Sequence, residues 1–117
     1  MPPELEPWTV CILFRPPDAP DLPEEELDRL QEEHIAHLQR LRDEGFLAAG
    51  GPLTDDRPDE SWRGFSIYRT GVEETRALTA RDPLVLAGRL APTIMTWLVP
   101  VGELPLRSQS AGSPPTA

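Results

Sequence analysis

The stretch Pro23-Glu-Glu-Glu-Leu-Asp-Arg-Leu-Gln-Glu-Glu-His-Ile-Ala-His-Leu-Gln-Arg-Leu-Arg-Asp-Glu44 carries the clearest structural pattern in the sequence. Apolar side chains and one histidine recur in it at steps of three and four residues, at Leu27, Leu30, His34, Leu38 and Leu41. That spacing is typical of one face of an amphipathic helix. Proline opens the segment, acidic residues crowd its first turn, arginines come late and Gly45 follows, an order that favours a helix. We therefore predict a helix over residues 23–44.

Four further segments predict strands. The near-continuous apolar run at residues 8–14, closed by prolines, is typical of a strand that is buried on both faces or central in a sheet. The other three segments lie at residues 46–53, 62–70 and 92–99. Before the last of them we predict a second helix over residues 73–80 and, after Asp82-Pro83, a short helical turn over residues 84–88.

The order of these elements predicts the fold class. The order βαββαβ, with an extra turn before the last strand, gives an α+β fold with an antiparallel sheet and a helix layer on one face. The other face of such a sheet needs cover, and a second copy of the chain would provide it. We therefore expect a homodimer.

Length and composition predict a single domain. The chain has 117 residues, and we assign residues 1–100 to the domain. Residues 101–117, rich in Ser, Gly and Pro, are expected to be disordered. The N-terminal residues do not resemble a signal peptide, and no apolar run approaches the roughly 20 residues of a membrane span. We expect a soluble, cytoplasmic protein.

The charge of the chain excludes several classes of partner. Acidic residues outnumber basic ones by 20 to 11, which gives a net charge of −9. Nucleic-acid binding depends on Lys and Arg side chains that neutralise phosphates, so we expect neither a nucleic acid nor an anionic membrane as a partner. All eleven basic residues are arginine, and the lack of lysine excludes a Schiff-base mechanism on a lysine side chain.

Several segments occur in an order that resembles a known family. His34-Ile-Ala-His-Leu-Gln-Arg-Leu-Arg-Asp-Glu-Gly45 runs directly into Phe46-Leu-Ala-Ala-Gly-Gly-Pro52, which gives a helical histidine, a leucine stripe, a glycine and a strand ending in Gly-Pro. Further landmarks follow in the order Arg63-Gly-Phe-Ser-Ile-Tyr-Arg69, the helix at 73–80, Asp82-Pro83, Ala87-Gly88 and Trp97. Together these segments resemble the YCII-related (YciI-like) family over residues 8–99.

The resemblance implies a ferredoxin-like βαββαβ unit, two copies of which pair into a dimeric α/β barrel. It also implies one pocket per subunit, lined by His34 and Asp82, and no cofactor. Members of the family include dechlorinating lyases, and many others have no assigned reaction. The proline-rich loop at residues 16–23 and the C-terminal tail depart from the simplest members, so the pocket mouth can differ from theirs.

His34 and Asp82 have structural explanations beside the functional one. A lone histidine on an apolar helix stripe is more often a hydrogen-bonded core residue, and an aspartate before a proline is typical of a helix N-cap. The resemblance favours catalysis, because an imidazole with a pKa of about 6.5 suits proton transfer at neutral pH. A capping aspartate also has a second oxygen free to accept from a histidine. We therefore predict an acid/base dyad of His34 and Asp82.

Other candidate residues carry weaker signals. Ser66, Tyr68 and Trp97 are candidates for substrate contacts, although large aromatic residues in strands are mainly core. Ser66 lacks the turn of a nucleophile elbow, so we expect no nucleophilic catalysis. His37 lies three residues after His34, whereas helical zinc pairs usually stand about four residues apart. We expect His37 to be partly exposed and to bind no metal.

These observations predict a small cofactor-independent enzyme. His34 would remove a proton next to an activated carbon while Asp82 orients the imidazole. The reaction would be an elimination such as dehydrochlorination, an isomerisation or a decarboxylation of a small organic substrate of cyclic or halogenated type. One alternative is a small-molecule-binding or accessory module without turnover, and another is a purely structural dimer. The presence of His34 and Asp82 favours the enzyme, because a structural dimer needs neither.

Overall fold

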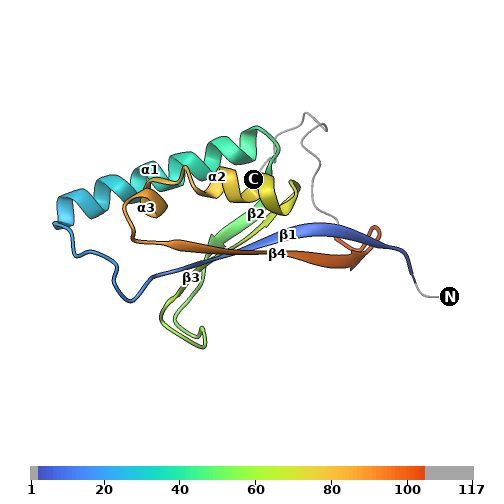
Figure 1. The fold of residues 1–117 in the computed structure, drawn as a ribbon, viewed down its shortest axis with the longest axis horizontal. Helices are drawn as coiled ribbons and strands as arrows, with labels where there is room; N and C mark the ends of the chain where they lie inside the picture. Colours follow the sequence, from blue (N-terminus) through green and yellow to red (C-terminus); the bar gives the residue numbers. More distant parts are fainter. Residues whose placement is uncertain (1–2, 105–117) are drawn as a thin grey trace.

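The computed structural model describes residues 3–104 of the chain. Along the sequence it contains β1 (Leu5–Phe14), α1 (Glu24–Asp43), β2 (Leu47–Pro52), β3 (Trp62–Tyr68), α2 (Val72–Thr79), α3 (Pro83–Leu86) and β4 (Ala91–Pro100) (Figure 1). The predicted order, with a short helix before the last strand, is confirmed. Most of the predicted disordered tail, residues 105–117, lies outside the described residues.

Both ends of the helix α1 lie within one residue of the predicted range 23–44. Glutamates fill its first turn, and Arg40 and Arg42 lie in its last, so the side-chain charges complement the helix dipole at both ends. Gly45 then adopts a φ of 88°, and the Phe46 N–H donates to the Leu41 carbonyl at 3.0 Å. This left-handed glycine closes the last turn and starts the path into β2.

The four strands form one antiparallel sheet in the order β2-β3-β1-β4. β1 is central, as its apolar run predicts, and pairs with β4 along its whole length. It begins at Leu5, earlier than the predicted start at residue 8. β3 ends opposite Thr9, so this extension of β1 is paired on one side only, and Pro7 is tolerated there.

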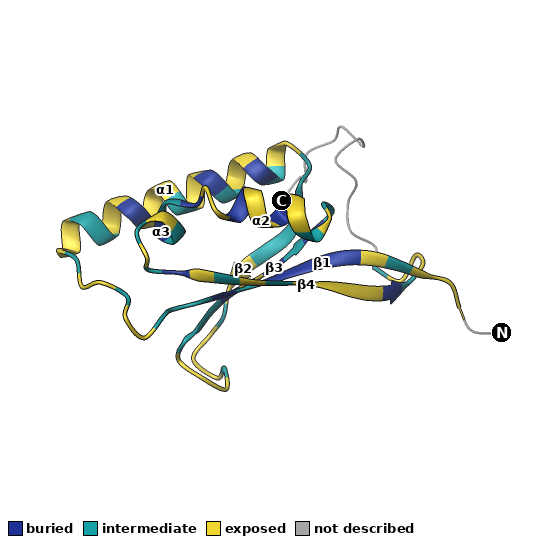
Figure 2. Cartoon of the chain, in the orientation of Figure 1, coloured by how far each residue is buried: buried dark blue, intermediate teal, exposed yellow. Residues whose placement is uncertain are grey.

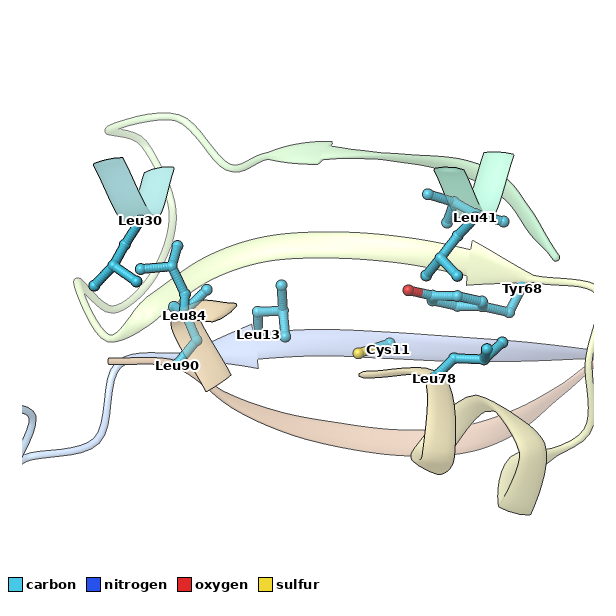
Figure 3. Close-up of a cluster of buried hydrophobic side chains, with 9 residues drawn as sticks. Cys11, Leu13, Leu30, Leu41, Tyr68, Leu78, Leu84 and Leu90 are labelled. Carbon is cyan, nitrogen blue, oxygen red and sulfur yellow. The ribbon is translucent and has the colours of Figure 1, made fainter. Parts of the chain in front are cut away.

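All three helices lie on one face of the sheet (Figure 1), and the main core lies between them and the strands (Figure 3). Its buried residues are Cys11, Leu13, Leu30, Leu41, Leu47, Tyr68, Leu78, Leu84 and Leu90. Cys11 is 1% exposed, and burial, with a smaller effect of the Asp82 charge, raises the pKa of its thiol to about 12. Such a thiol stays neutral and packs as a small apolar side chain.

The opposite face of the sheet, which we call the open face, carries no helix within residues 3–104 (Figure 1). Successive side chains of a strand point to opposite faces, so Val10 and Ile12 lie on the open face while Cys11 lies in the core. The register places on it the apolar residues Trp8, Val10, Ile12, Phe65, Ile67, Met95 and Trp97. Figure 2 shows exposed residues along β4. None of the described helices is both long and apolar enough to cross a membrane.

Candidate functional site

His34 and Asp82 come together although they lie 48 residues apart in the sequence. His34 lies in the middle of α1, and Asp82 lies in the link between α2 and α3. The Nδ1 atom of His34 is 2.6 Å from Oδ2 of Asp82. The two side chains are 12% and 3% exposed, so water competes little for this bond. Hydrogen bonds to a carboxylate in such surroundings are strong.

Asp82 is held in place by its own backbone neighbours. It is the N-cap of α3, with extended φ and ψ of −63° and 127°, and Pro83 occupies the first helical turn. Its Oδ1 atom accepts from the Leu84 N–H at 2.9 Å. Capping therefore engages one carboxylate oxygen and leaves the other, Oδ2, to His34. The two roles weighed for this residue are compatible.

The partner of Nδ1 determines how a neutral His34 carries its proton. A carboxylate only accepts hydrogen bonds, so Nδ1 must donate to Asp82. The proton of a neutral imidazole then lies on Nδ1, and Nε2 keeps its lone pair. Nε2 is therefore the atom of His34 that can take a proton from a bound molecule.

A cavity of about 500 Å³ lies beside this pair. Its walls come from α1 and α3, from β1, β2 and β3, and from the segments that directly follow β1 and α3. His34 is a lining residue, whereas Asp82 lies behind it and does not line the cavity. The volume is in the usual range of roughly 300 to 1,000 Å³ for pockets that bind small molecules.

Comparison with known proteins adds to this geometry. The YCII-related domain matches residues 9–97, most of the chain. The chain belongs to the YCII-related family. Among solved structures, this YCII-related chain is similar to 5-chloro-2-hydroxyhydroquinone dehydrochlorinase (TftG) from Burkholderia phenoliruptrix, in complex with 2,5-dihydroxybenzoquinone. The identity is 19%, the TM-score is 0.56, and the match covers 77% of this chain and 92% of that chain. No curated protein matches the sequence.

At that identity the likeness shows the fold alone. It confirms the predicted α+β, ferredoxin-like fold with an antiparallel sheet. The sheet order β2-β3-β1-β4 and the helix layer on one face agree with this assignment. The roles of individual residues in the YCII-related chain rest on its own geometry.

Ser66 lies at the cavity of this YCII-related chain. It pairs with Cys11 and Gly50 on the helix side of the sheet and lines the cavity. A Cβ atom on Gly50 would lie 2.8 Å from Oγ of Ser66, so only glycine fits there without a shift. At the neighbouring Gly51, by contrast, a Cβ atom would meet nothing within 4 Å.

Tyr68 and Trp97, the other two predicted substrate contacts, do not line the cavity. Tyr68 is 2% exposed, and Figure 3 shows it between Leu41 and Leu78 in the core. Burial is the main cause that raises the pKa of its phenol. Trp97 pairs with Trp8 on the open face, on the other side of the sheet from His34. Of the three, only Ser66 is placed to meet a ligand in the cavity.

The predicted exposure of His37 is wrong, because its side chain is 5% exposed. α2 packs beside this part of α1, and Nε2 of His37 donates to the Leu78 carbonyl at 3.1 Å. Burial is the main cause that lowers the pKa of this histidine, while the Asp82 charge acts in the opposite direction. Within residues 3–104, no three His, Cys, Asp or Glu side chains are grouped so that they could hold a metal ion.

Sequence reasoning missed three arginines of the site. Arg15, Arg63 and Arg89 all line the cavity. With eleven arginines in the chain, residue type alone does not distinguish them. Their positions could have identified them. Arg15 directly follows the first predicted strand, Arg63 lies at the start of the third, and Arg89 lies shortly before the fourth. In an antiparallel sheet of this order, those three positions share one end of the sheet.

Proposed function

We propose that the chain is a small-molecule enzyme of the lyase type, in which His34 is the general base and Asp82 orients it. The bond of 2.6 Å between the two side chains, at the wall of the cavity, carries this proposal. Asp82 fixes the imidazole so that Nε2 is free to accept a proton. It also stabilises the imidazolium that forms, because a carboxylate next to a cation is favourable where water is scarce.

The reaction we favour is an elimination on a small cyclic substrate. His34 takes a proton from a carbon next to an electron-withdrawing group. The electron pair of that C–H bond forms a double bond, and a leaving group such as chloride departs with its own pair. The imidazolium then returns its proton to solvent. The dehydrochlorinase activity in the name of the structural neighbour supports this class, and isomerisation or decarboxylation would begin with the same kind of base.

Turnover assays with the His34→Gln variant test this proposal. The substrate panel starts with chlorinated hydroquinones, including 5-chloro-2-hydroxyhydroquinone, and the readout is free chloride. A second readout is deuterium uptake into the substrate from heavy water, which detects proton abstraction without elimination. We expect turnover or exchange with the native chain and a loss of roughly 100-fold or more in the variant. Equal rates for the native chain and a folded variant would contradict the role of His34.

A binding module without turnover is the second candidate function. The observation that favours it is the bond from the Leu84 N–H to Asp82, which gives this aspartate a structural role as a helix cap. In that case the cavity would hold a ligand, and the His34→Gln variant would change affinity without any loss of reaction. Calorimetric titration beside the turnover assay separates the two functions.

We also propose that the open face pairs with a second copy of the chain. Phe65, Met95 and Trp97 are 38%, 42% and 41% exposed, and neighbouring large apolar side chains of this kind are typical of interaction surfaces. Met95→Glu should shift the sedimentation of the protein from dimer to monomer. Leu86→Glu is the matched control, because Leu86 is 74% exposed on α3, away from the open face. A native chain that sediments as a monomer would refute the dimer.

A further inference from the structure

Three arginines meet at one end of the sheet. Phe14, the last residue of β1, pairs with Trp62 at the start of β3 and with Ala91 at the start of β4. Arg15 therefore leaves β1 where the two neighbouring strands begin. Arg63 is the second residue of β3, and Arg89 lies just before β4. All three line the cavity that contains His34.

The charges of these arginines act on one another. Burial lowers the pKa of Arg15, and the positive charges of Arg63, Arg89 and Arg57 lower it further. Like charges raise the energy of the folded state unless something negative lies between them. The cluster is therefore unfavourable for the chain alone.

Asp28 also lines the cavity, but no carboxylate of the described residues forms an ion pair with the three arginines. Residues 1–2 and 105–117 contain no Asp or Glu. The chain has 20 acidic residues and a net charge of −9, so acidic side chains are abundant elsewhere. The positive end of the cavity is a local exception to the charge of the whole protein.

The hydrogen bonds of the cluster are also incomplete. Arg63 donates to the Glu60 carbonyl at 3.2 Å, and Arg89 donates to the Pro20 carbonyl at 2.9 Å. The Nε atom of Arg15 is buried and has no hydrogen-bond partner among the described residues. An arginine on an apolar surface normally keeps its head group in water. A buried donor without a partner costs free energy unless a ligand accepts from it.

We propose that the cavity binds its substrate as an anion, a small ring carrying a carboxylate or an ionised enol or phenol, with Arg15 as the principal contact and Arg63 and Arg89 beside it. This inference deepens the proposed function and rests on the same cavity. A guanidinium suits such a group because its planar donors match two oxygens at once. The same positive charge would favour the enolate that forms when His34 removes a proton next to a carbonyl.

Binding of benzoate tests the inference, with benzamide as its neutral counterpart of similar shape. Both are titrated into the native chain and into Arg15→Met, with calorimetry and protein NMR as readouts. Arg76→Met is the matched control, because Arg76 is exposed on α2 and does not line the cavity. We expect benzoate to bind more tightly than benzamide, and Arg15→Met to weaken benzoate by roughly tenfold or more without changing benzamide. Arg76→Met should bind as the native chain does.

Three results would overturn the inference: equal affinity of the native chain for the two probes, unchanged benzoate affinity in Arg15→Met, or no benzoate binding at millimolar concentration. A His34→Gln variant separates this test from that of the proposed function. If that variant still prefers benzoate while the native chain shows no turnover of any substrate, the anion site stands and the catalytic role of His34 falls. If turnover depends on His34 but benzoate and benzamide bind with equal affinity, the anion site is refuted and the catalytic role of His34 is kept.

Discussion

Asp82 performs two tasks with two oxygens, so two substitutions of it should separate stability from activity. Asp82→Asn keeps an oxygen that can accept from the Leu84 N–H, but its amide nitrogen cannot accept from Nδ1 of His34. Asp82→Ala removes both acceptors and leaves the buried Leu84 N–H without a partner. The first change therefore spares the cap of α3, and the second does not.

The structure sets the expected magnitudes. Loss of an N-cap acceptor costs about 1 kcal/mol, and a buried donor left without a partner costs about 1 to 3 kcal/mol. Asp82→Ala should thus lower the free energy of unfolding by about 2 kcal/mol more than Asp82→Asn does. Activity should fall in both variants by roughly 100-fold to 10,000-fold, because His34 loses the acceptor that holds its proton on Nδ1.

Urea unfolding gives the stabilities, and nitrogen NMR of the imidazole gives the tautomer of His34. Asp59→Asn is the matched control: Asp59 accepts from the Ser61 N–H at 2.7 Å in the same local manner, but it has no histidine partner. It should leave the tautomer and the activity unchanged. Full activity in Asp82→Asn, or equal stability of the two Asp82 variants, would refute the division of roles between Oδ1 and Oδ2.

Three further predictions concern the surroundings of the site. Arg15→Met should raise the free energy of unfolding, measured in urea, by about 1 kcal/mol, because it removes a buried donor that has no partner. A lower stability of this variant would show that Arg15 does not destabilise the folded chain. His37 has a lowered pKa in the folded state, so the unfolded chain binds more protons at low pH; stability should fall as the pH drops below about 6.5, and His37→Gln should flatten this dependence in urea titrations across pH. Gly50→Ala should destabilise the fold by about 1 to 3 kcal/mol through its clash with Ser66, whereas Gly51→Ala should not, and equal melting temperatures would show that the strand moves to make room.

The fold was accessible from the sequence because its strongest signals are local. The spacing of Leu30, His34 and Leu41, the acidic first turn and Gly45 act within one helix and need no tertiary information. The apolar run of β1 favoured a strand that is buried on both faces or central in the sheet, and the central place is the one observed. The early start of β1 at Leu5 was missed because pairing with β4, a distant segment, extends it through Pro7.

The site was only partly accessible. His34 and Asp82 each have a local structural explanation, and their contact across 48 residues was predicted from the family resemblance rather than from either residue. The exposure of His37 was misjudged because α2 covers its side chain. The spacing of apolar residues along α1 does not show which other helix packs against it. The face on which Trp97 lies depends on the strand register, and a shift of one residue would reverse it.

The cap of α3 places a natural spectroscopic reporter inside the protein. The amide proton of Leu84 is bonded to the same carboxylate that holds His34, and the side chain of Leu84 lines the cavity. A change in the charge of Asp82, or in the strength of its hydrogen bond with His34, alters the electron density at the oxygen that accepts from this amide. The chemical shift and the hydrogen-exchange rate of one backbone amide would then follow the protonation and occupancy of the site, with no label and no knowledge of the substrate.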